Sequence, residues 1–82
     1  MQRDDNTLSG VAETLACIAE VDRVSIVRDS RFSEFGINSL SMIDLVVAVE
    51  DRFNVRIPDE EAERFETVCD MVEFLHRAMV AT

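Results

Sequence analysis

The chain has 82 residues, 48% of them hydrophobic and 30% charged, with two glycines and one proline. This length provides one core, and the composition is too apolar for a disordered tail and too poor in turn formers for a β-sandwich or barrel. A net charge of -9 opposes the phosphate contacts that nucleic acids and anionic membranes require. We therefore expect one all-α domain over residues 1–82 whose partners are proteins with basic patches.

The first periodic segment covers about residues 7–21. Leu8, Val11, Leu15 and Ile18 share one helical face, and Thr7 is a suitable capping residue. The polar residues before this segment form no apolar run of signal-peptide length, and no stretch is apolar enough for a membrane span. These features predict an opening helix in a cytoplasmic protein.

A long connection follows, over about residues 22–38. Its apolar side chains are expected to fold back over the core, and they are Val24, Ile26, Val27, Phe32 and Phe35. Gly36 supplies the backbone freedom for the turn into the next element.

The second helix is predicted over residues 39–53, with Asn38 or Ser39 as its cap. At 100° per residue, one side forms a sufficient core face and consists of Met42, Leu45, Val46, Val49 and Phe53. A different side carries further apolar residues beside acids, namely Leu40, Ile43 and Val47 with Asp44, Glu50 and Asp51. Because an outer helix of so small a bundle cannot be covered all round, part of this second side is expected to stay exposed.

Two more helices are predicted, a short one over residues 59–65 and a last one over residues 67–79. The short helix opens with three acids, which the helix dipole favours there. Thr67 and Asp70 have the spacing of a capping box before an apolar stripe of helical period.

Motifs for catalysis or metal binding are missing from the sequence. His76 has no neighbouring nucleophile, and Cys17 and Cys69 form no familiar metal-ligand spacing with it. We expect no enzymatic activity and no metal. Ser39 is the unusual residue, because it opens the most apolar helix directly after the long loop. Its simplest interpretation is a capping hydroxyl.

The segment FSEFGINSL, from Phe32 to Leu40, resembles the phosphopantetheine attachment segment of acyl carrier proteins, whose core is Gly-x-Asp-Ser-Leu. The resemblance continues in the family's order through Asp44-Leu45, residues 48–53, residues 57–63 and Thr67-Val68. Together these segments cover about half of the chain.

The resemblance implies a four-helix acyl-carrier bundle, with three main helices, one short helix and a long first loop. It implies that a phosphopantetheinyl transferase attaches 4'-phosphopantetheine to Ser39, and that the monomeric carrier then holds acyl groups as thioesters. Ketosynthases, acyltransferases or acyl-activating enzymes with basic docking patches would bind the second helix. The expected contacts are Leu40, Ile43, Asp44, Val47, Glu50 and Asp51.

Two positions depart from the family pattern. Asn38 replaces the usual Asp before the serine, and Ser41 stands where many fatty-acid carriers have an acid. Both remove charge beside Ser39, which favours a specialised polyketide or modified fatty-acyl pathway over general fatty-acid synthesis. Two alternatives remain: a peptidyl or aminoacyl carrier, and an acidic interaction domain without the prosthetic group.

Overall fold

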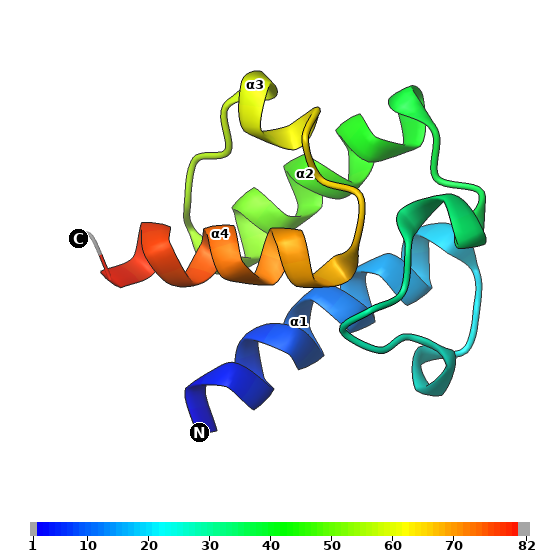
Figure 1. Cartoon of the computed structure of the whole chain (residues 1–82), viewed down its shortest axis with the longest axis horizontal. Coiled ribbons are helices and arrows are strands. Elements are labelled where there is room, and N and C mark those ends of the chain that lie inside the picture. The colour runs from blue at the N-terminus through cyan, green and yellow to red at the C-terminus, as the bar shows by residue number, and fades with distance from the viewer. Residues whose placement is uncertain (1, 81–82) are drawn as a thin grey trace.

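The computed structural model describes residues 2–80. Its elements are α1 (Gln2–Ala19), the 3-10 helices η1 (Arg23–Ser25) and η2 (Phe32–Phe35), α2 (Ser39–Phe53), α3 (Asp59–Ala62) and α4 (Val68–Val80). The long connection from α1 to α2 lies at the opposite side of the molecule from the start of α1 and the end of α4 (Figure 1). The predicted all-α fold, with three main helices, a short one and a long first loop, is confirmed.

The first helix is longer at its start than its apolar pattern indicated. It begins at Gln2, and Thr7 is a buried residue inside it, so the expected capping role of Thr7 is wrong. The segment before Thr7 contains neither Gly nor Pro, so no residue there opposes a helix. At the other end the helix stops at Ala19, short of Val21. Glu20 is left-handed with φ 59°, and the Val21 N–H donates to the Ala16 carbonyl at 3.2 Å.

The core forms where α1 packs against both α2 and α4. The largest fully buried side chains come from these three helices, and they are Leu15, Leu45, Met71, Leu75, Val11, Val49, Val68 and Val72. On the predicted core face of α2, Leu45, Val46 and Val49 are buried, whereas Met42 and Phe53 are partly buried against the same core. The face that the spacing assigned to the core is the face that packs.

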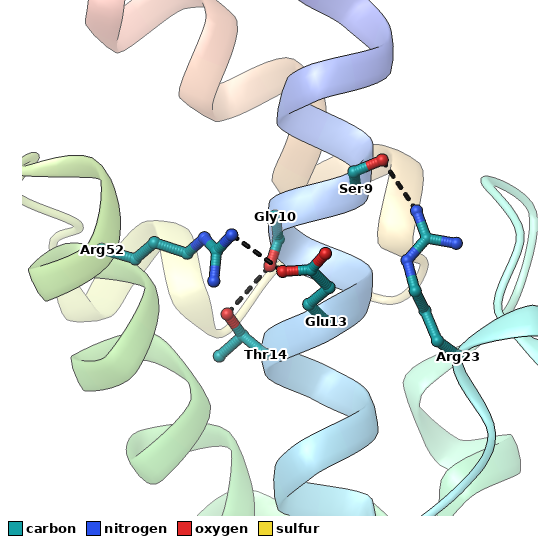
Figure 2. Close-up of polar contacts among 6 residues, drawn as sticks. All are labelled: Ser9, Gly10, Glu13, Thr14, Arg23 and Arg52. Carbon is teal, nitrogen blue, oxygen red and sulfur yellow. Dashed lines mark hydrogen bonds and ion pairs between the residues drawn. The ribbon is translucent and has the colours of Figure 1, made fainter.

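The contact between α1 and α2 is close because Gly10 lies there. A Cβ atom at Gly10 would lie 2.5 Å from Cζ of Phe53, well inside contact distance. An ion pair of 2.8 Å between Arg52 on α2 and Glu13 on α1 spans the rim of this contact (Figure 2). Both partners are about half exposed, so the pair contributes at most about 1 kcal/mol. The close approach at Gly10 therefore depends on shape more than on charge.

The long connection is held against the start of α4 by backbone hydrogen bonds. The Phe32 N–H donates to the Glu66 carbonyl at 3.0 Å, and the Val68 N–H donates to the Ser30 carbonyl at 2.9 Å. The Phe32 side chain is buried, as expected, and Phe35 and Ile26 also pack on the core. These bonds fix the segment that leads into α2.

Two valines of this connection do not pack as expected. Val24 is 84% exposed and Val27 is 55% exposed, so their assignment to the core is wrong. Val24 lies in η1, which is held to α1 by a hydrogen bond of 2.7 Å from Arg23 to the Ser9 hydroxyl (Figure 2). This bond directs the connection along the surface at Val24 instead of into the core.

The last two helices match their predicted bounds to different degrees. The short helix α3 ends at Ala62 instead of 65, and the chain continues to Phe65 with tighter bonds to residues three positions back. The capping box before α4 is present. The Thr67 hydroxyl accepts from the Asp70 N–H at 3.2 Å, and the Asp70 carboxylate accepts from the Thr67 N–H at 3.1 Å.

Candidate functional site

The start of α2 is capped by Asn38. Its side-chain Oδ1 accepts a hydrogen bond of 3.0 Å from the Ser41 N–H, and its carbonyl accepts one of 2.8 Å from the Met42 N–H. Ser39 is the first helical residue and is exposed. The interpretation of Ser39 as the cap is therefore wrong, and its hydroxyl remains available to solvent.

The chain reaches Ser39 through a turn that Gly36 makes possible. Gly36 has φ 76°, a left-handed backbone conformation that residues other than glycine rarely adopt. The Gly36 N–H donates to the Ser33 carbonyl, and the Ile37 N–H donates to the Phe32 carbonyl, both at 3.2 Å. Buried Phe32 thus anchors the turn from below, and Ser39 lies two residues beyond Ile37.

The first turn of α2 differs in charge from the first turns of α3 and α4. The first turn of α2 contains no acidic residue, whereas α3 has Asp59, Glu60 and Glu61 in its first turn and α4 has Asp70. The amino terminus of a helix favours a negative group, because its first N–H groups lack helical partners. At α2 that preference is not met by a side-chain carboxylate of the first turn.

An open cleft of about 930 Å³ begins beside Ser39 and is bounded by α2, α3 and the connections flanking them. Its apolar lining consists of Phe32, Ile37, Met42, Ile43, Val46, Val47, Ile57, Pro58, Ala62 and Phe65. Its polar and charged lining consists of Arg31, Ser33, Asn38, Ser39, Glu50, Arg56, Asp59, Glu63 and Glu66. Such a cleft can cover an apolar chain that starts at the serine.

We define the exposed strip of α2 as Leu40, Ile43 and Val47. Their side chains are 75%, 60% and 58% exposed, as the helical spacing predicted for the side away from the core. Asp44 and Asp51, which share that side of the helix, are exposed as well. The strip therefore presents apolar surface beside free carboxylates.

Glu50 differs from these two acids. It is half-buried, and its Oε2 accepts a hydrogen bond of 2.6 Å from the Ile57 N–H. The carboxylate thus already has a partner within the chain, where it fixes the link between α2 and α3. The spacing on α2 placed Glu50 near the strip but gave no sign of this internal bond.

The site offers a modifiable hydroxyl and lacks a catalytic arrangement around it. In the described part of the chain, no side-chain base is hydrogen-bonded to the Ser39 hydroxyl. Serine hydroxyls become nucleophiles when a neighbouring base accepts their proton. The described residues therefore supply no such base at Ser39. No group of three or more His, Cys, Asp or Glu side chains among the described residues is arranged to hold a metal ion.

The sequence pattern missed two features of this region. The cleft is one of them, because it is formed by residues from four separate segments whose proximity no local spacing encodes. The other is the cap, since Asn38 and Ser39 are equally good capping types and only the backbone geometry shows which one precedes the helix.

No helix of residues 2–80 is both long and apolar enough to cross a membrane.

Comparisons with known proteins agree with this geometry. Residues 9–75 match the family model described as the phosphopantetheine attachment site. The chain is 35% identical to the acyl carrier protein of Acidothermus cellulolyticus over 78 residues, which covers 94% of this chain and 93% of that one. It is 37% identical to the acyl carrier protein of Kineococcus radiotolerans over 79 residues, 95% of this chain and 98% of the other.

A solved structure shows the same fold. The crystal structure of an acyl carrier protein from Thermotoga maritima superimposes with a TM-score of 0.84 at 25% identity, covering 96% of this chain and 93% of that one. A family model that matches most of the chain, and relatives that match nearly all of it, leave one conclusion. The chain belongs to the acyl carrier protein family, and it is a carrier without catalytic activity of its own whose prosthetic group is phosphopantetheine.

Proposed function

We propose that Ser39 is the single attachment point of the 4'-phosphopantetheine arm, and that the arm carries acyl intermediates as thioesters in polyketide or modified fatty-acid synthesis. The observation that carries the proposal is the position of Ser39. Ser39 is exposed at the first position of α2 and has no capping role, and it lies at a cleft whose lining is about half apolar. The alternative of an acidic interaction domain without the arm does not account for this arrangement.

The surroundings of Ser39 fit the arm. A phosphodiester needs hydrogen-bond donors and no adjacent carboxylate, and the first turn of α2 provides unpaired N–H groups and no acid. The Asn38 side chain is neutral, and its Oδ1 accepts the hydrogen bond from Ser41 that holds the start of the helix. The rest of the arm can lie along the cleft, which is apolar over most of α2. When bound, the arm supplies the terminal thiol on which acyl groups are held.

Attachment forms one bond to this chain. Ser39 Oγ bonds to the phosphorus of coenzyme A that bears the pantetheine, the phosphoanhydride bond of coenzyme A breaks, and the adenosine bisphosphate leaves. The serine proton passes to a base of the transferase, because no base among the described residues is hydrogen-bonded to that hydroxyl. Neither Cys17 nor Cys69 takes part in this chemistry.

The exposed strip of α2 is the proposed docking surface for the enzymes that load and use the carrier. Its apolar side chains are available for burial, and exposed Asp44 and Asp51 attract basic patches. The candidate partners are the transferase, ketosynthases, and acyltransferases or acyl-activating enzymes. Glu50 also holds the link between α2 and α3 at the edge of this surface, because its Oε2 accepts a hydrogen bond from the Ile57 N–H. We place the protein in the cytoplasm as a monomer, with these enzymes.

The attachment site is tested by intact-mass measurement after incubation with coenzyme A and a transferase. The wild type should gain one pantetheinyl group, and Ser39→Ala should gain none. Because Ser39 is exposed and does not cap α2, the change should alter the free energy of unfolding by no more than about 0.5 kcal/mol.

Ser33→Ala is the matched control. Ser33 is another exposed serine that lines the same cleft, so its variant should load like the wild type. Loading of Ser39→Ala would refute the assignment. A wild type that takes no group from any transferase would favour the interaction-domain alternative.

A further inference from the structure

Of the seven arginine side chains that the structure describes, four are engaged with a neighbour. Arg23 donates to Ser9, Arg28 donates to Cys69, Arg52 pairs with Glu13, and Arg77 lies over the Phe74 ring. The guanidinium groups of Arg31, Arg56 and Arg64 make no hydrogen bond or ion pair within the described residues. Because the chain has 17 acidic residues, a guanidinium group that pairs with none of them is available to an anionic ligand.

Two of the three free arginines line the cleft that opens at Ser39, namely Arg31 and Arg56, and Arg64 does not. Arg56 precedes Ile57, whose N–H is held by the Glu50 carboxylate at 2.6 Å. Glu50 lies eleven residues after Ser39 on α2, which at 1.5 Å per residue is about 16 Å along the helix. Arg56 is thus anchored near the end of the cleft opposite to the serine, where the end of an attached arm would reach.

Four acids share the cleft lining, and they determine what Arg56 can do. Asp59, Glu63 and Glu66 are exposed, and Glu50 is bonded to the Ile57 N–H. Their combined field, which is part of the net charge of -9, repels a carboxylate that makes no direct contact. A guanidinium binds a carboxylate through two parallel hydrogen bonds, which reverses that preference at one point.

We propose that Arg56 binds the free carboxylate of a dicarboxylic acyl group carried on the Ser39 arm, so that the cleft favours carboxylated cargo over uncharged cargo of the same length. This inference rests on the proposed attachment at Ser39. An exposed ion pair is weak between free partners. The covalent arm makes the encounter intramolecular, which raises the population of such a pair above that of free partners.

The test is the acidity of the cargo itself. The protein is loaded from glutaryl-coenzyme A labelled with 13C at the terminal carboxyl, and NMR titration gives the pKa of that carboxyl, with glutaryl-pantetheine as the reference. The negative field of the protein alone raises this pKa above the reference. Contact with Arg56 lowers it, by about half a pH unit for a solvent-exposed pair.

Arg56→Gln should move the cargo pKa above the reference, whereas Arg64→Gln, which removes the same charge outside the cleft, should leave it below. A wild-type pKa at or above the reference overturns the proposal. So do equal changes in the two variants, or loss of the effect in Arg31→Gln alone. The intact mass of the same samples reports attachment separately, so a failure to load would refute the proposed function, whereas loading with an unlowered pKa refutes only the role of Arg56.

Discussion

The two sides of α2 contain similar residues but differ in their surroundings. On one side Leu45 and Val49 are fully buried, and on the other Leu40 and Val47 are 75% and 58% exposed. The buried side packs against α1 and sets the position of the helix. The exposed side has no such role, so its apolar residues are available for contacts outside the chain. The comparison teaches that residue type on α2 does not tell which apolar residues hold the fold and which stay exposed, whereas the side of the helix does.

The sharpest way to break this comparison is the same substitution on both sides. Leu45→Ala should lower the free energy of unfolding by about 2–5 kcal/mol, since it removes a buried side chain and leaves a cavity. Leu40→Ala should change it by less than about 0.5 kcal/mol, because this side chain is mostly in water already. Urea denaturation of both variants measures the difference.

If Leu45→Ala is too unstable to fold, the free energy of unfolding of Leu45→Met is measured in its place, as a smaller change at the same buried position. It conserves most of the volume and should cost less than about 1.5 kcal/mol. Equal losses for Leu45→Ala and Leu40→Ala would show that the two sides do not differ in burial as the structure has them.

The buried side is also sensitive to added volume. Gly10→Ala should destabilise the fold by about 1 kcal/mol. The new Cβ would lie 2.5 Å from the Phe53 ring, a clash worth about 1–3 kcal/mol, and the better helix propensity of Ala recovers up to about 1 kcal/mol. In a Phe53→Leu background the clash is relieved, so Gly10→Ala should become neutral or stabilising. A double-mutant cycle by urea denaturation measures this coupling. Additive effects would mean that the ring does not limit the approach.

The sequence predicted α2 better than it predicted the elements around it, for identifiable reasons. Asn38 caps its start, and Asn54, left-handed with φ 57°, ends it, so both ends are marked by local chemistry. The start of α1 has no such marker, and the expected start at Thr7 was too late. The close approach at Gly10 could not be predicted from the sequence pattern, because it depends on Phe53, a residue far along the chain.

The candidate site divides in the same way. The place of Ser39 at the start of α2 and the exposure of the strip could be predicted, because a capping signal and a helical period are local properties of the sequence. The cleft and the bond from Ile57 to Glu50 could not, since they depend on where the link after α2 returns. Val24 and Val27 show the opposite error, because an apolar residue in a connection does not have to reach the core.

On the exposed side, charge reversals and the loss of apolar surface should affect partner binding in different ways. Asp44→Lys or Asp51→Lys should slow association with a partner that has a basic patch, by about tenfold at low salt. The defect should shrink as salt rises towards 1 M, where the Debye length is about 3 Å. Val47→Ala should instead weaken binding at every salt concentration, mainly through faster dissociation. Association and dissociation rates with a transferase or ketosynthase distinguish the two. Charge reversals that leave association unchanged at low salt, in folded variants, would refute docking through this surface.

The smallest effect is expected at the boundary between the two sides, where Asn38 caps α2 beside Ser39. Asn38→Asp keeps a side-chain oxygen for the Ser41 N–H and adds a negative charge at the helix start, so the fold should be unchanged or slightly more stable. With a transferase adapted to the Gly-x-Asp-Ser-Leu motif, the added charge should speed loading by a few-fold, because electrostatic complementarity acts mainly on the association rate.

Asn38→Ala is the matched control. It removes the capping bond at a cost of about 1 kcal/mol and adds no charge, so it should load no faster than the wild type. Initial loading rates at several salt concentrations test the prediction. If Asn38→Asp loads at the wild-type rate at low salt, then the neutral residue before Ser39 does not limit recognition by that transferase.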